Sequence, residues 1–184
     1  IKVTITTAES AIASDEYAYI TQIVEAQNLQ QLAYGSSAAK QVTLSFYVKS
    51  SVTGTFAVGL YKPDNTAQIH NLTYTINSAS TWEYKTLTFP ANTTAGGVIN
   101  DDNGVGFYVN WHLAAGSGFK GGGSTSGWVS YANNKWADGQ ATDAVITTTN
   151  ATFQLTGCQL EVGDTATDFE HRTFADEFNK CCRY

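Results

Sequence analysis

Apolar and polar residues alternate along most of the chain, in short runs that turn residues separate about every ten positions. The clearest run is QVTLSFYVKS, residues 41–50, where one parity is occupied by Val42, Leu44, Phe46 and Val48. Successive side chains of a strand point to opposite faces, so this alternation predicts a strand with one buried face. Repeated along the chain, the pattern predicts an all-β sandwich or barrel.

Other runs of the same kind predict further strands, and two of them carry additional signals. The runs TAQIHNLTYTI (66–76) and TWEYKTLTFP (81–90) are expected to pair with each other across the loop at 78–81. In residues 151–162 the apolar parity shifts by one position at Gly157, which predicts a β-bulge. The remaining strands are expected within residues 1–5, 17–23, 55–62 and 105–112.

Two segments between the strands predict other structure. AQNLQQLA, residues 26–33, predicts a short helical turn that Gly35 ends. Residues 114–127 are dense in glycine, and this backbone freedom is unsuited to a core strand. We therefore expect a surface loop over 114–127.

The period changes after Thr173. Phe174, Phe178 and Cys181 follow at i, i+4 and i+7, which is helical spacing. Thr173 occupies the N-cap position with Asp176 three residues on. Cations at the other end complement the helix dipole, namely Lys180 and Arg183. A short C-terminal α-helix is therefore predicted.

These signals divide the chain into two parts. Residues 1–166 are expected to form the β-sandwich domain, and residues 167–184 a linker followed by the helix. Phe174 and Phe178 share one face of that helix, and burial of both rings would stabilise it. We expect them to pack on the sandwich or on a neighbouring subunit.

Charge and hydropathy each exclude one class of partner. Charged residues make up only 14% of the chain, and the net charge is −6 with scattered lysines and arginines. Binding to a phosphate backbone needs clustered cations, so nucleic acid is not expected as a partner. No run approaches the roughly 18 apolar residues of a membrane span, so no membrane insertion is expected either.

The cysteines predict neither a disulfide framework nor a metal site. Their number is odd, and Cys181 and Cys182 are adjacent, so a bond between them would close a strained ring. We expect both, and Cys158, to be reduced. His171 is the only nearby additional ligand, so we expect no metal and no cofactor.

Catalytic motifs are not found in the sequence. There is no nucleophile elbow, no H-E-x-x-H and no phosphate-binding loop, and the three histidines lie on separate predicted elements. A pair of carboxylates could still hydrolyse glycosides. The candidates for such a pair are Glu83, Asp101, Asp102, Asp138 and Asp143. Because aspartates beside turns commonly cap the local backbone, we expect no enzyme activity.

Two charged segments have a structural and a functional interpretation. NDDNG, residues 100–104, offers oxygen ligands for calcium but lacks the EF-hand order, so we favour a turn. Glu170-His171-Arg172 could be a reactive group or an ion pair between the last strand and the helix. We favour the ion pair, because crowded charges at such a joint are commonly surface bridges.

Aromatic residues provide the strongest sign of a binding function. Flat aromatic faces beside polar side chains suit the rings of sugars. Trp128, Tyr131 and Trp136 lie in or after the glycine-dense segment and are candidates for stacking on glycans, with core packing as the alternative. Trp82 and Trp111 lie in predicted strands, where we expect them to fill the core.

Four segments of the chain resemble one known family. They are KQVTLSFYVKSSVTGTFAVGLY, STWEYKTLTFP, DNGVGFYVNWHLAAGS and ATFQLTGCQLEVGDTATDFEHRTFADEFNKCCRY. It is the jelly-roll domain, similar to carbohydrate-binding modules, of tail-fibre, head-fibre and appendage proteins of phages, of the marine phage type. The resemblance runs from about residue 17 to the end and is most specific in QLEVG-ATDFEHR. It implies a jelly-roll β-sandwich in a virion, and a structural role for the C-terminal joint.

The resemblance also implies the partners. They are other copies of the chain in a homotrimer, other virion proteins, and polysaccharide on the host surface. No binding residue carries over from it. We therefore expect a non-enzymatic virion protein displayed on a fibre or appendage. The alternatives are a dedicated lectin-like carbohydrate-binding module and, less favoured, a polysaccharide depolymerase domain.

Overall fold

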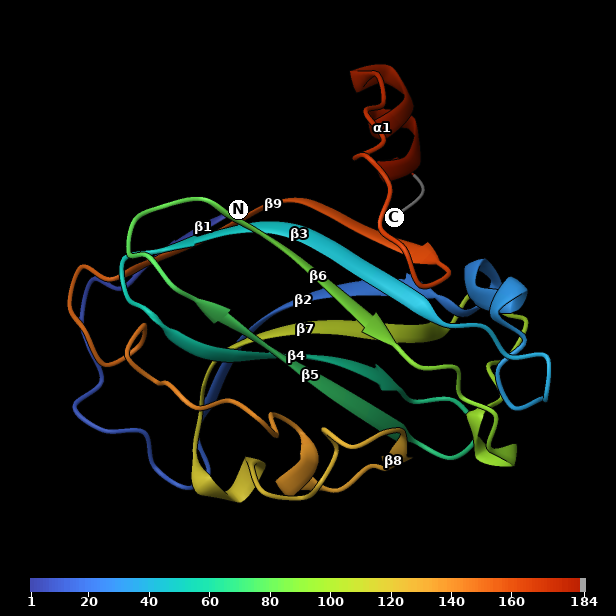
Figure 1. The fold of residues 1–184 in the computed structure, drawn as a ribbon, viewed down its shortest axis with the longest axis horizontal. Coiled ribbons are helices and arrows are strands. Elements are labelled where there is room, and N and C mark those ends of the chain that lie inside the picture. The colour runs from blue at the N-terminus through green and yellow to red at the C-terminus, as the bar shows by residue number, and fades with distance from the viewer. Residues whose placement is uncertain (183–184) are drawn as a thin grey trace.

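The computed structural model describes residues 1–182. In this part of the chain, the strands form two antiparallel sheets that pack face to face (Figure 1). A short helix, α1 (Phe174–Cys181), stands apart from the sheets. The predicted all-β sandwich with a short C-terminal helix is confirmed.

The chain moves repeatedly between the sheets. Among the described residues, one sheet has the order β1 (Lys2–Thr4), β9 (Thr152–Val162), β3 (Val42–Ser50), β6 (Glu83–Phe89). The other has the order β2 (Tyr17–Glu25), β7 (Val105–Ala115), β4 (Gly54–Lys62), β5 (Gln68–Ile76), β8 (Val129–Ser130). We call them the four-stranded and the five-stranded sheet. Segments far apart in sequence are therefore neighbours in space.

One expected pairing is wrong. The runs at 66–76 and 81–90 do not pair with each other, since β5 pairs with β4 and β8 while β6 pairs with β3. The chain crosses from one sheet to the other between them. Alternation shows which side chains of a strand are buried, but two strands in opposite sheets share the same alternation.

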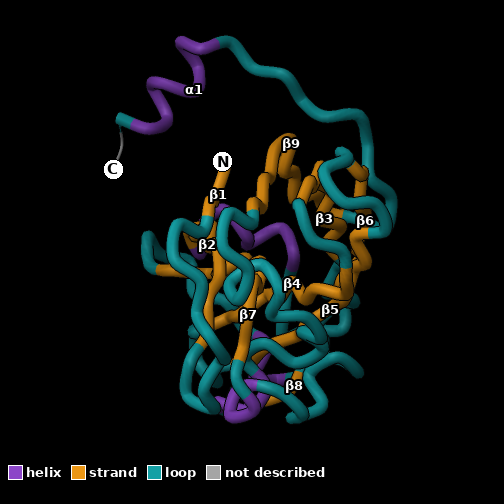
Figure 2. The backbone as a smooth tube through the Cα atoms, turned by 90° about the vertical axis from the view of Figure 1, so that its left-hand side faces the viewer, coloured by secondary structure: helices purple, strands orange, loops and turns teal. Residues whose placement is uncertain are grey.

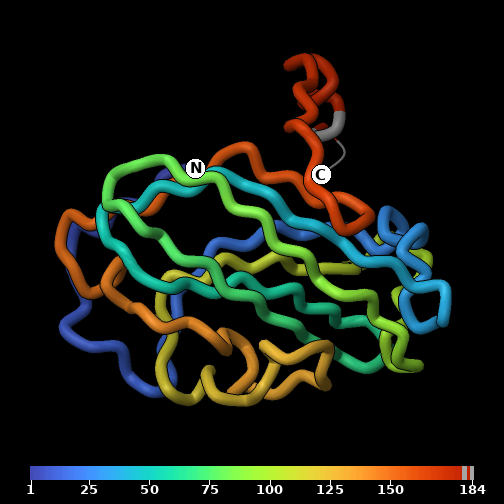
Figure 3. The backbone as a smooth tube through the Cα atoms, viewed as in Figure 1, coloured from blue at the N-terminus to red at the C-terminus, as the bar shows by residue number. Residues whose placement is uncertain are grey.

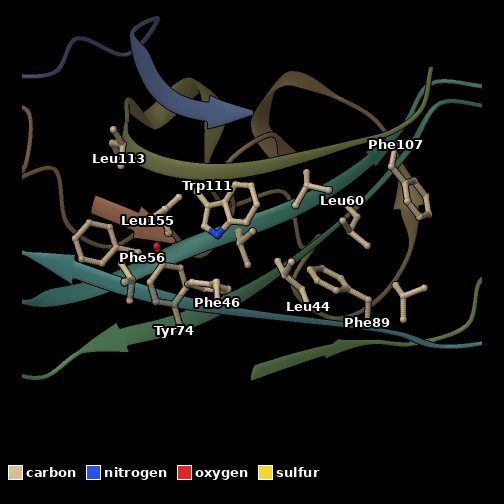
Figure 4. Close-up of a cluster of buried hydrophobic side chains, with 14 of the residues drawn as sticks. Leu44, Phe46, Phe56, Leu60, Tyr74, Phe89, Phe107, Trp111, Leu113 and Leu155 are labelled. Atoms are coloured by element: carbon tan, nitrogen blue, oxygen red, sulfur yellow. The ribbon is translucent and has the colours of Figure 1, made fainter. Parts of the chain in front are cut away.

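Side chains from both sheets meet in one core (Figure 4). Phe46 of β3 lies 5.1 Å from the ring of Tyr74 and 5.9 Å from that of Trp111, both of the five-stranded sheet. Trp111 is buried, as predicted. Full burial of a side chain of this size stabilises by about 1.5–3 kcal/mol, so the core holds the two sheets together.

The prediction that Trp82 fills the core is wrong. Trp82 precedes β6, and 44% of it is exposed. The ammonium of Lys49 lies 5.9 Å from the centre of its ring. Along β6 the inward parity belongs to Glu83, Lys85, Leu87 and Phe89, which are opposite buried residues of β3. Trp82 shares the outward parity of Tyr84, so it faces away from the core.

The predicted β-bulge lies at Gly157. The register between β3 and β9 shifts between Ser45 and Tyr47, and Gly157 has a φ of +57°. This is the left-handed region, where glycine avoids the steric penalty of a Cβ atom. The bulge explains why the apolar parity of β9 changes in the middle of the strand.

Short 3-10 helices lie in the connections. The predicted turn after β2 is η1 (Ala26–Leu32), which buries three apolar side chains and ends at Ala33 in the left-handed conformation. The loop over 95–97 contains η2 (Ala95–Gly97). Residues 116–146 form a long loop that contains η3 (Ser117–Phe119), β8 and η4 (Asn133–Lys135). Residues 116–127 of the glycine-dense segment are thus part of a surface loop, as predicted, whereas Ala114 and Ala115 belong to β7 and are buried.

The cap of α1 forms as predicted. The N–H of Asp176 donates to Thr173 Oγ1 at 3.2 Å, and that hydroxyl donates to Asp176 Oδ2 at 2.7 Å. Each group satisfies the other at the helix start. Of the cations expected at the far end, Arg183 and the side chain of Lys180 lie outside the described residues.

The phenylalanines of α1 do not pack on the sandwich. Phe174 is 84% exposed and Phe178 is 55% exposed, and the two rings stack on each other with centres 5.9 Å apart. The expectation that they pack on the chain's own sheet is therefore wrong, because the linker over 163–173 carries the helix away from the sheets (Figure 2). Their contact with a neighbouring subunit stays a prediction.

Candidate functional site

Strand β2 presents two tyrosines to solvent on the outer face of the five-stranded sheet. Tyr17 and Tyr19 stack with ring centres 5.6 Å apart and an interplanar angle of 23°. They are 47% and 38% exposed. As the edge strand of this sheet, β2 leaves the rings open to a ligand on one side.

A second tyrosine pair lies on the same face, on β7, which is next to β2, and on β4, the strand beyond it. Tyr61 of β4 and Tyr108 of β7 are register partners, and their rings stack 5.7 Å apart at 30°. Directly opposed aromatic residues on one face of an antiparallel pair commonly stabilise each other. Both pairs therefore follow from outward alternation along their strands.

The long loop over 116–146 completes the group with Tyr131 and Trp136. The ring of Trp136 lies 5.5 Å from Tyr19, 5.5 Å from Tyr61 and 5.9 Å from Tyr131. Trp136 thus joins the two tyrosine pairs into one continuous group. We call this group the aromatic surface; its members are Tyr17, Tyr19, Tyr61, Tyr108, Tyr131 and Trp136.

The loop over 116–146 runs along the five-stranded sheet (Figure 3), and polar side chains of the sheet and of the loop hold it in place. The amide of Asn71 donates to Ser124 Oγ and to the carbonyl of Lys135, both at 2.7 Å. Gln140 Oε1 accepts from the N–H of Ala57 at 2.7 Å. Because these bonds are buried or partly buried, they fix the loop, and with it Trp136, against the strands.

A buried polar layer lies under the aromatic surface, around Gly59. A Cβ atom on Gly59 would lie 2.2 Å from Asn71 Oδ1 and 3.5 Å from His112 Nε2. Asn110, opposite Gly59 in the register, is fully buried, and its amide makes no hydrogen bond to any described residue. Buried amides normally have partners, so the unpaired amide of Asn110 is an exception within a layer that is too closely packed to accept a Cβ atom on Gly59.

Burial shifts the pKa of His112, Tyr61 and Tyr131 toward the uncharged form of each group. It lowers the pKa of His112 to about 3, although the nearby backbone of Trp136 opposes the shift. Burial, followed by the nearby Tyr108, raises the pKa of Tyr61. Burial also raises the pKa of Tyr131, with smaller effects from Tyr61 and Tyr17. The site thus offers neutral rings and hydroxyl groups, which suit a neutral polyhydroxylated ligand.

The structure brings together two of the three residues that the sequence singled out. Tyr131 and Trp136 belong to the aromatic surface, but Trp128 closes one end of the core. Its indole N–H donates to the carbonyl of Pro90 at 2.8 Å, and its ring stacks on Phe107 at 6.1 Å. Loop residues have no periodicity, so sequence alone could not separate Trp128 from the other two.

Three strand tyrosines of the aromatic surface were missed in the sequence, namely Tyr17, Tyr19 and Tyr61. The available signal was their parity, because Tyr17 and Tyr19 alternate with the partly buried Ala18 and Ile20. Parity places them outside the core but does not show that β2 and β4 flank the same strand, β7. That information exists only in the sheet order.

Four of the five carboxylates considered for catalysis accept hydrogen bonds from the backbone. The pKa of Glu83 is lowered to about 2, first by a hydrogen bond from Lys85 and then by backbone N–H groups of the adjacent loop. Three aspartates accept from backbone N–H groups at 2.8–2.9 Å: Asp102 from Gly104, Asp138 from Gly121, and Asp143 from Ala115. Each has a structural role that accounts for its position.

The charged residues at the strand-to-helix joint form ion pairs with one another. Arg172 pairs with Glu170 at 2.8 Å and with Glu177 at 3.5 Å, so the predicted ion pair at the strand-to-helix joint is present. Within residues 1–182, no group of three or more His, Cys, Asp or Glu side chains is arranged to hold a metal ion. Cys158 and Cys182 are free thiols, and the side chain of Cys181 lies outside the described residues.

A smaller aromatic group lies on the opposite outer face. Tyr47 of β3 and Tyr84 of β6 are register partners with rings 5.0 Å apart, and Trp82 precedes Tyr84 in the chain. All three are between 44% and 48% exposed. In contrast to the aromatic surface, no described loop residue contributes a ring contact to this pair.

Comparison with protein-family models, with curated proteins and with solved structures finds no match to this chain. Among the described residues, no helix has the length and apolar composition needed to cross a membrane. The function is therefore argued from the geometry of the surface itself.

Proposed function

We propose that this chain is a non-enzymatic domain that contacts carbohydrate through the aromatic surface. The observation that carries the proposal is the joining of two outward tyrosine pairs by Trp136 on one face of the sandwich. Exposed aromatic faces provide apolar area for the C–H groups of a sugar ring. The tyrosine hydroxyls, with the raised pKa of Tyr61 and Tyr131, supply neutral hydrogen-bonding groups beside it.

We further propose that the sandwich is a jelly roll. Support comes from the strand order, in which β1, β9, β3 and β6 form one sheet and β2, β7, β4 and β5 the other, so that among these eight strands the chain changes sheet at every step except from β4 to β5. Pairing of early with late strands in both sheets is the wrapping pattern of two Greek keys. The short β8 is then an addition to the β5 edge.

The proposed setting is a phage virion, on a fibre or appendage, with the chain in a homotrimer. The family resemblance of the C-terminal segment supports this setting. The exposed Phe174–Phe178 pair on α1 supports contact with a neighbouring subunit or another virion protein, because stacked rings of this size gain from burial. Several copies would also multiply weak binding to a repetitive host polysaccharide.

Binding to a glycan array tests the carbohydrate proposal. We compare wild type with Tyr19→Ala, which truncates an exposed ring of the aromatic surface, and with Tyr84→Ala, which truncates an exposed ring on the opposite face. Loss of one stacking ring is expected to weaken binding about tenfold, equivalent to about 1.4 kcal/mol. Tyr84→Ala should bind as wild type does. Absence of binding by wild type at millimolar sugar, or equal losses in the two variants, would contradict the proposal.

A depolymerase function would be detected by a different assay. Incubation of the protein with host polysaccharide should release no new reducing ends, because four of the five candidate carboxylates accept backbone hydrogen bonds. Release that Asp138→Asn or Asp143→Asn abolishes would show an enzyme and overturn the non-enzymatic assignment.

A further inference from the structure

Unpaired polar atoms are concentrated under the aromatic surface. Among the described residues, nine buried side-chain nitrogen and oxygen atoms make no hydrogen bond of normal geometry. Six of the nine lie in this one place: the amide oxygen of Asn71, both amide atoms of Asn110, both ring nitrogens of His112 and the indole nitrogen of Trp136. Because most buried polar atoms in proteins are paired, a cluster of this size needs a cause.

Asn71, Asn110 and His112 share one face of three neighbouring strands. Asn71 of β5 and Asn110 of β7 are both register partners of Gly59 in β4, and directly opposed residues direct their side chains to the same face. His112 follows Asn110 by two positions in β7 and therefore shares that face. Since Asn71 Oδ1 lies 2.2 Å from the place of a Cβ atom on Gly59, the amide of Asn71 lies above the middle strand. We call these three residues the polar layer.

The polar layer lowers the stability of the fold. All three of its residues are fully or almost fully buried. An unpaired polar group in such a place keeps the cost of desolvation without the hydrogen bond that would offset it. Apolar side chains of similar size would avoid this cost. Buried groups that weaken a fold are commonly retained at functional sites, and this layer lies directly under the surface proposed to contact glycans.

The indole of Trp136 lies over this layer without a hydrogen bond of its own. The ring centre of Trp136 is 6.0 Å from that of His112, and its N–H is buried without an acceptor. The tyrosine rings around the indole meet it at interplanar angles of 65–89°, which are edge contacts, and they belong to Tyr17, Tyr19, Tyr61 and Tyr131. Packing alone therefore holds the indole in place.

Hydrogen bonds hold the backbone beside the indole. The N–H of Trp136 donates to the carbonyl of Asn133 at 3.0 Å. The carbonyl of Lys135 accepts from the amide of Asn71 at 2.7 Å and from Ser124 Oγ at 2.9 Å. Rotation of the indole to another side-chain rotamer would thus uncover the polar layer without moving the loop. The indole N–H would gain a hydrogen bond to solvent in the rotated state.

We propose that Asn110 and His112 bind hydroxyl groups of the glycan when the indole of Trp136 rotates away. This inference rests on the proposed function and assigns the polar layer as the hydrogen-bonding part of the same site. An amide both donates and accepts, and so does a neutral imidazole, which matches the donor and acceptors of a hydroxyl group. The ligand class is a neutral glycan whose hydroxyl groups project beyond the stacked ring.

Hydrogen exchange of the indole N–H groups tests the rotation on the free protein. Trp136 is compared with Trp111, whose indole N–H is also buried and unpaired but belongs to the core between the sheets. NMR of isotope-labelled protein follows both signals, and the variant Trp136→Phe assigns that of Trp136. Rotation should make Trp136 exchange at least about tenfold faster than Trp111, which exchanges only when the core opens.

Buried variants separate binding from folding. Asn110→Leu removes the unpaired amide and keeps a similar side-chain shape, so it should keep or raise the midpoint of thermal unfolding and weaken glycan binding about tenfold. His112→Phe should act in the same way. The control Asn92→Leu replaces an equally buried amide that is paired with Gln68 at 2.6 Å and Thr94 at 2.7 Å. It should lower the midpoint and leave the affinity unchanged. Calorimetric titration with the glycan that binds most strongly on the array measures affinity.

Two results would overturn the inference alone. They are exchange of Trp136 no faster than that of Trp111, and wild-type affinity in both Asn110→Leu and His112→Phe. A loss of stability in Asn110→Leu as large as that in Asn92→Leu would also contradict it, because the fold itself would then need the amide of Asn110. Wild type that binds no glycan would overturn the proposed function together with this inference.

Discussion

The two outer faces of the sandwich arise from the same alternation, but only one of them is built up by a loop. On the four-stranded sheet, the hydroxyls of Thr43 and Thr88 pair at 3.0 Å, and Tyr47 and Tyr84 form an isolated pair in solvent. On the five-stranded sheet, the loop over 116–146 brings Trp136 between two tyrosine pairs. Outward aromatic residues are therefore common to both faces, and the anchored loop is what makes one of them a larger surface.

The difference extends below the surface. Under the aromatic surface lie Asn110 and His112, both fully buried on the outer side of their strand. Outward residues are normally solvated, so burial of such polar groups is a consequence of the loop and rings above them. The face with the aromatic surface should thus be more sensitive to change than the face with the Tyr47–Tyr84 pair.

The largest expected effect concerns the core that both faces share. Phe46→Ala should lower the free energy of unfolding by about 3–5 kcal/mol, because it opens a cavity between Tyr74 and Trp111. The adjacent outward substitution Tyr47→Ala should change it by less than about 1 kcal/mol. Urea unfolding of both variants is the measurement, and similar losses would contradict the assignment of inward and outward parity along β3.

A second effect is the dependence of the free energy of unfolding on pH, which tests the polar layer under the aromatic surface. The pKa of His112 is about 3 in the folded chain against 6.5 as the ordinary value, so the unfolded chain binds more protons between these values. Stability should therefore be independent of His112 above pH 6.5 and fall as pH decreases, by up to about 1.4 kcal/mol per pH unit.

Urea unfolding between pH 6.5 and 5.5 measures this slope above the range in which Glu83 of the unfolded chain is protonated. His70, whose pKa burial also lowers, contributes a slope of the same sign, so His112→Gln should reduce the slope without removing it. A slope that His112→Gln does not change would show that the ring is hydrated in the folded state.

A smaller effect on the free energy of unfolding is expected when a methyl group is added at Gly59. Gly59→Ala places a methyl group 2.2 Å from the present position of Asn71 Oδ1, so the amide and the loop bonded to it must move. We expect a loss of about 1–3 kcal/mol, measured by urea unfolding. Thr86→Ala, an exposed position of β6, should change stability by no more than about 0.5 kcal/mol. If Gly59→Ala is equally neutral, the packed layer under the aromatic surface is not rigid.

The smallest effect on stability is expected on the outer face of the four-stranded sheet. Thr88→Val removes the hydroxyl that pairs with Thr43, whose own hydroxyl still donates to the carbonyl of Gly163 at 2.8 Å. The loss should be about 0.5–1 kcal/mol, which thermal unfolding can detect as a shift of a few degrees. A loss comparable to that of Gly59→Ala would remove the contrast between the faces.

Local patterns in the sequence predicted local structure well. Alternation predicted β3, the parity shift predicted the bulge at Gly157, and Thr173 with Asp176 predicted the helix cap. Each depends on residues within a few positions of one another. The backbone geometry of these elements is therefore encoded where they occur.

The prediction failed where distant segments had to be related. The pairing of 66–76 with 81–90 and the core position of Trp82 both assumed that neighbouring runs share a sheet and that tryptophans in strands face inward. On β6 the inward positions are instead occupied by Glu83 and Lys85. These charged residues at inward positions led to the wrong assignment of the inward and outward faces of β6. The joining of Tyr19, Tyr61 and Trp136 likewise depends on sheet order and loop anchoring.

The most direct test of the carbohydrate account is an NMR titration of isotope-labelled protein with the glycan that binds most strongly on the array. The account predicts that the largest shifts occur at the indole N–H of Trp136 and at the backbone amides of Tyr19 and Tyr61. Largest shifts at Tyr47, Tyr84 and Trp82, or no shift at millimolar glycan, would contradict it.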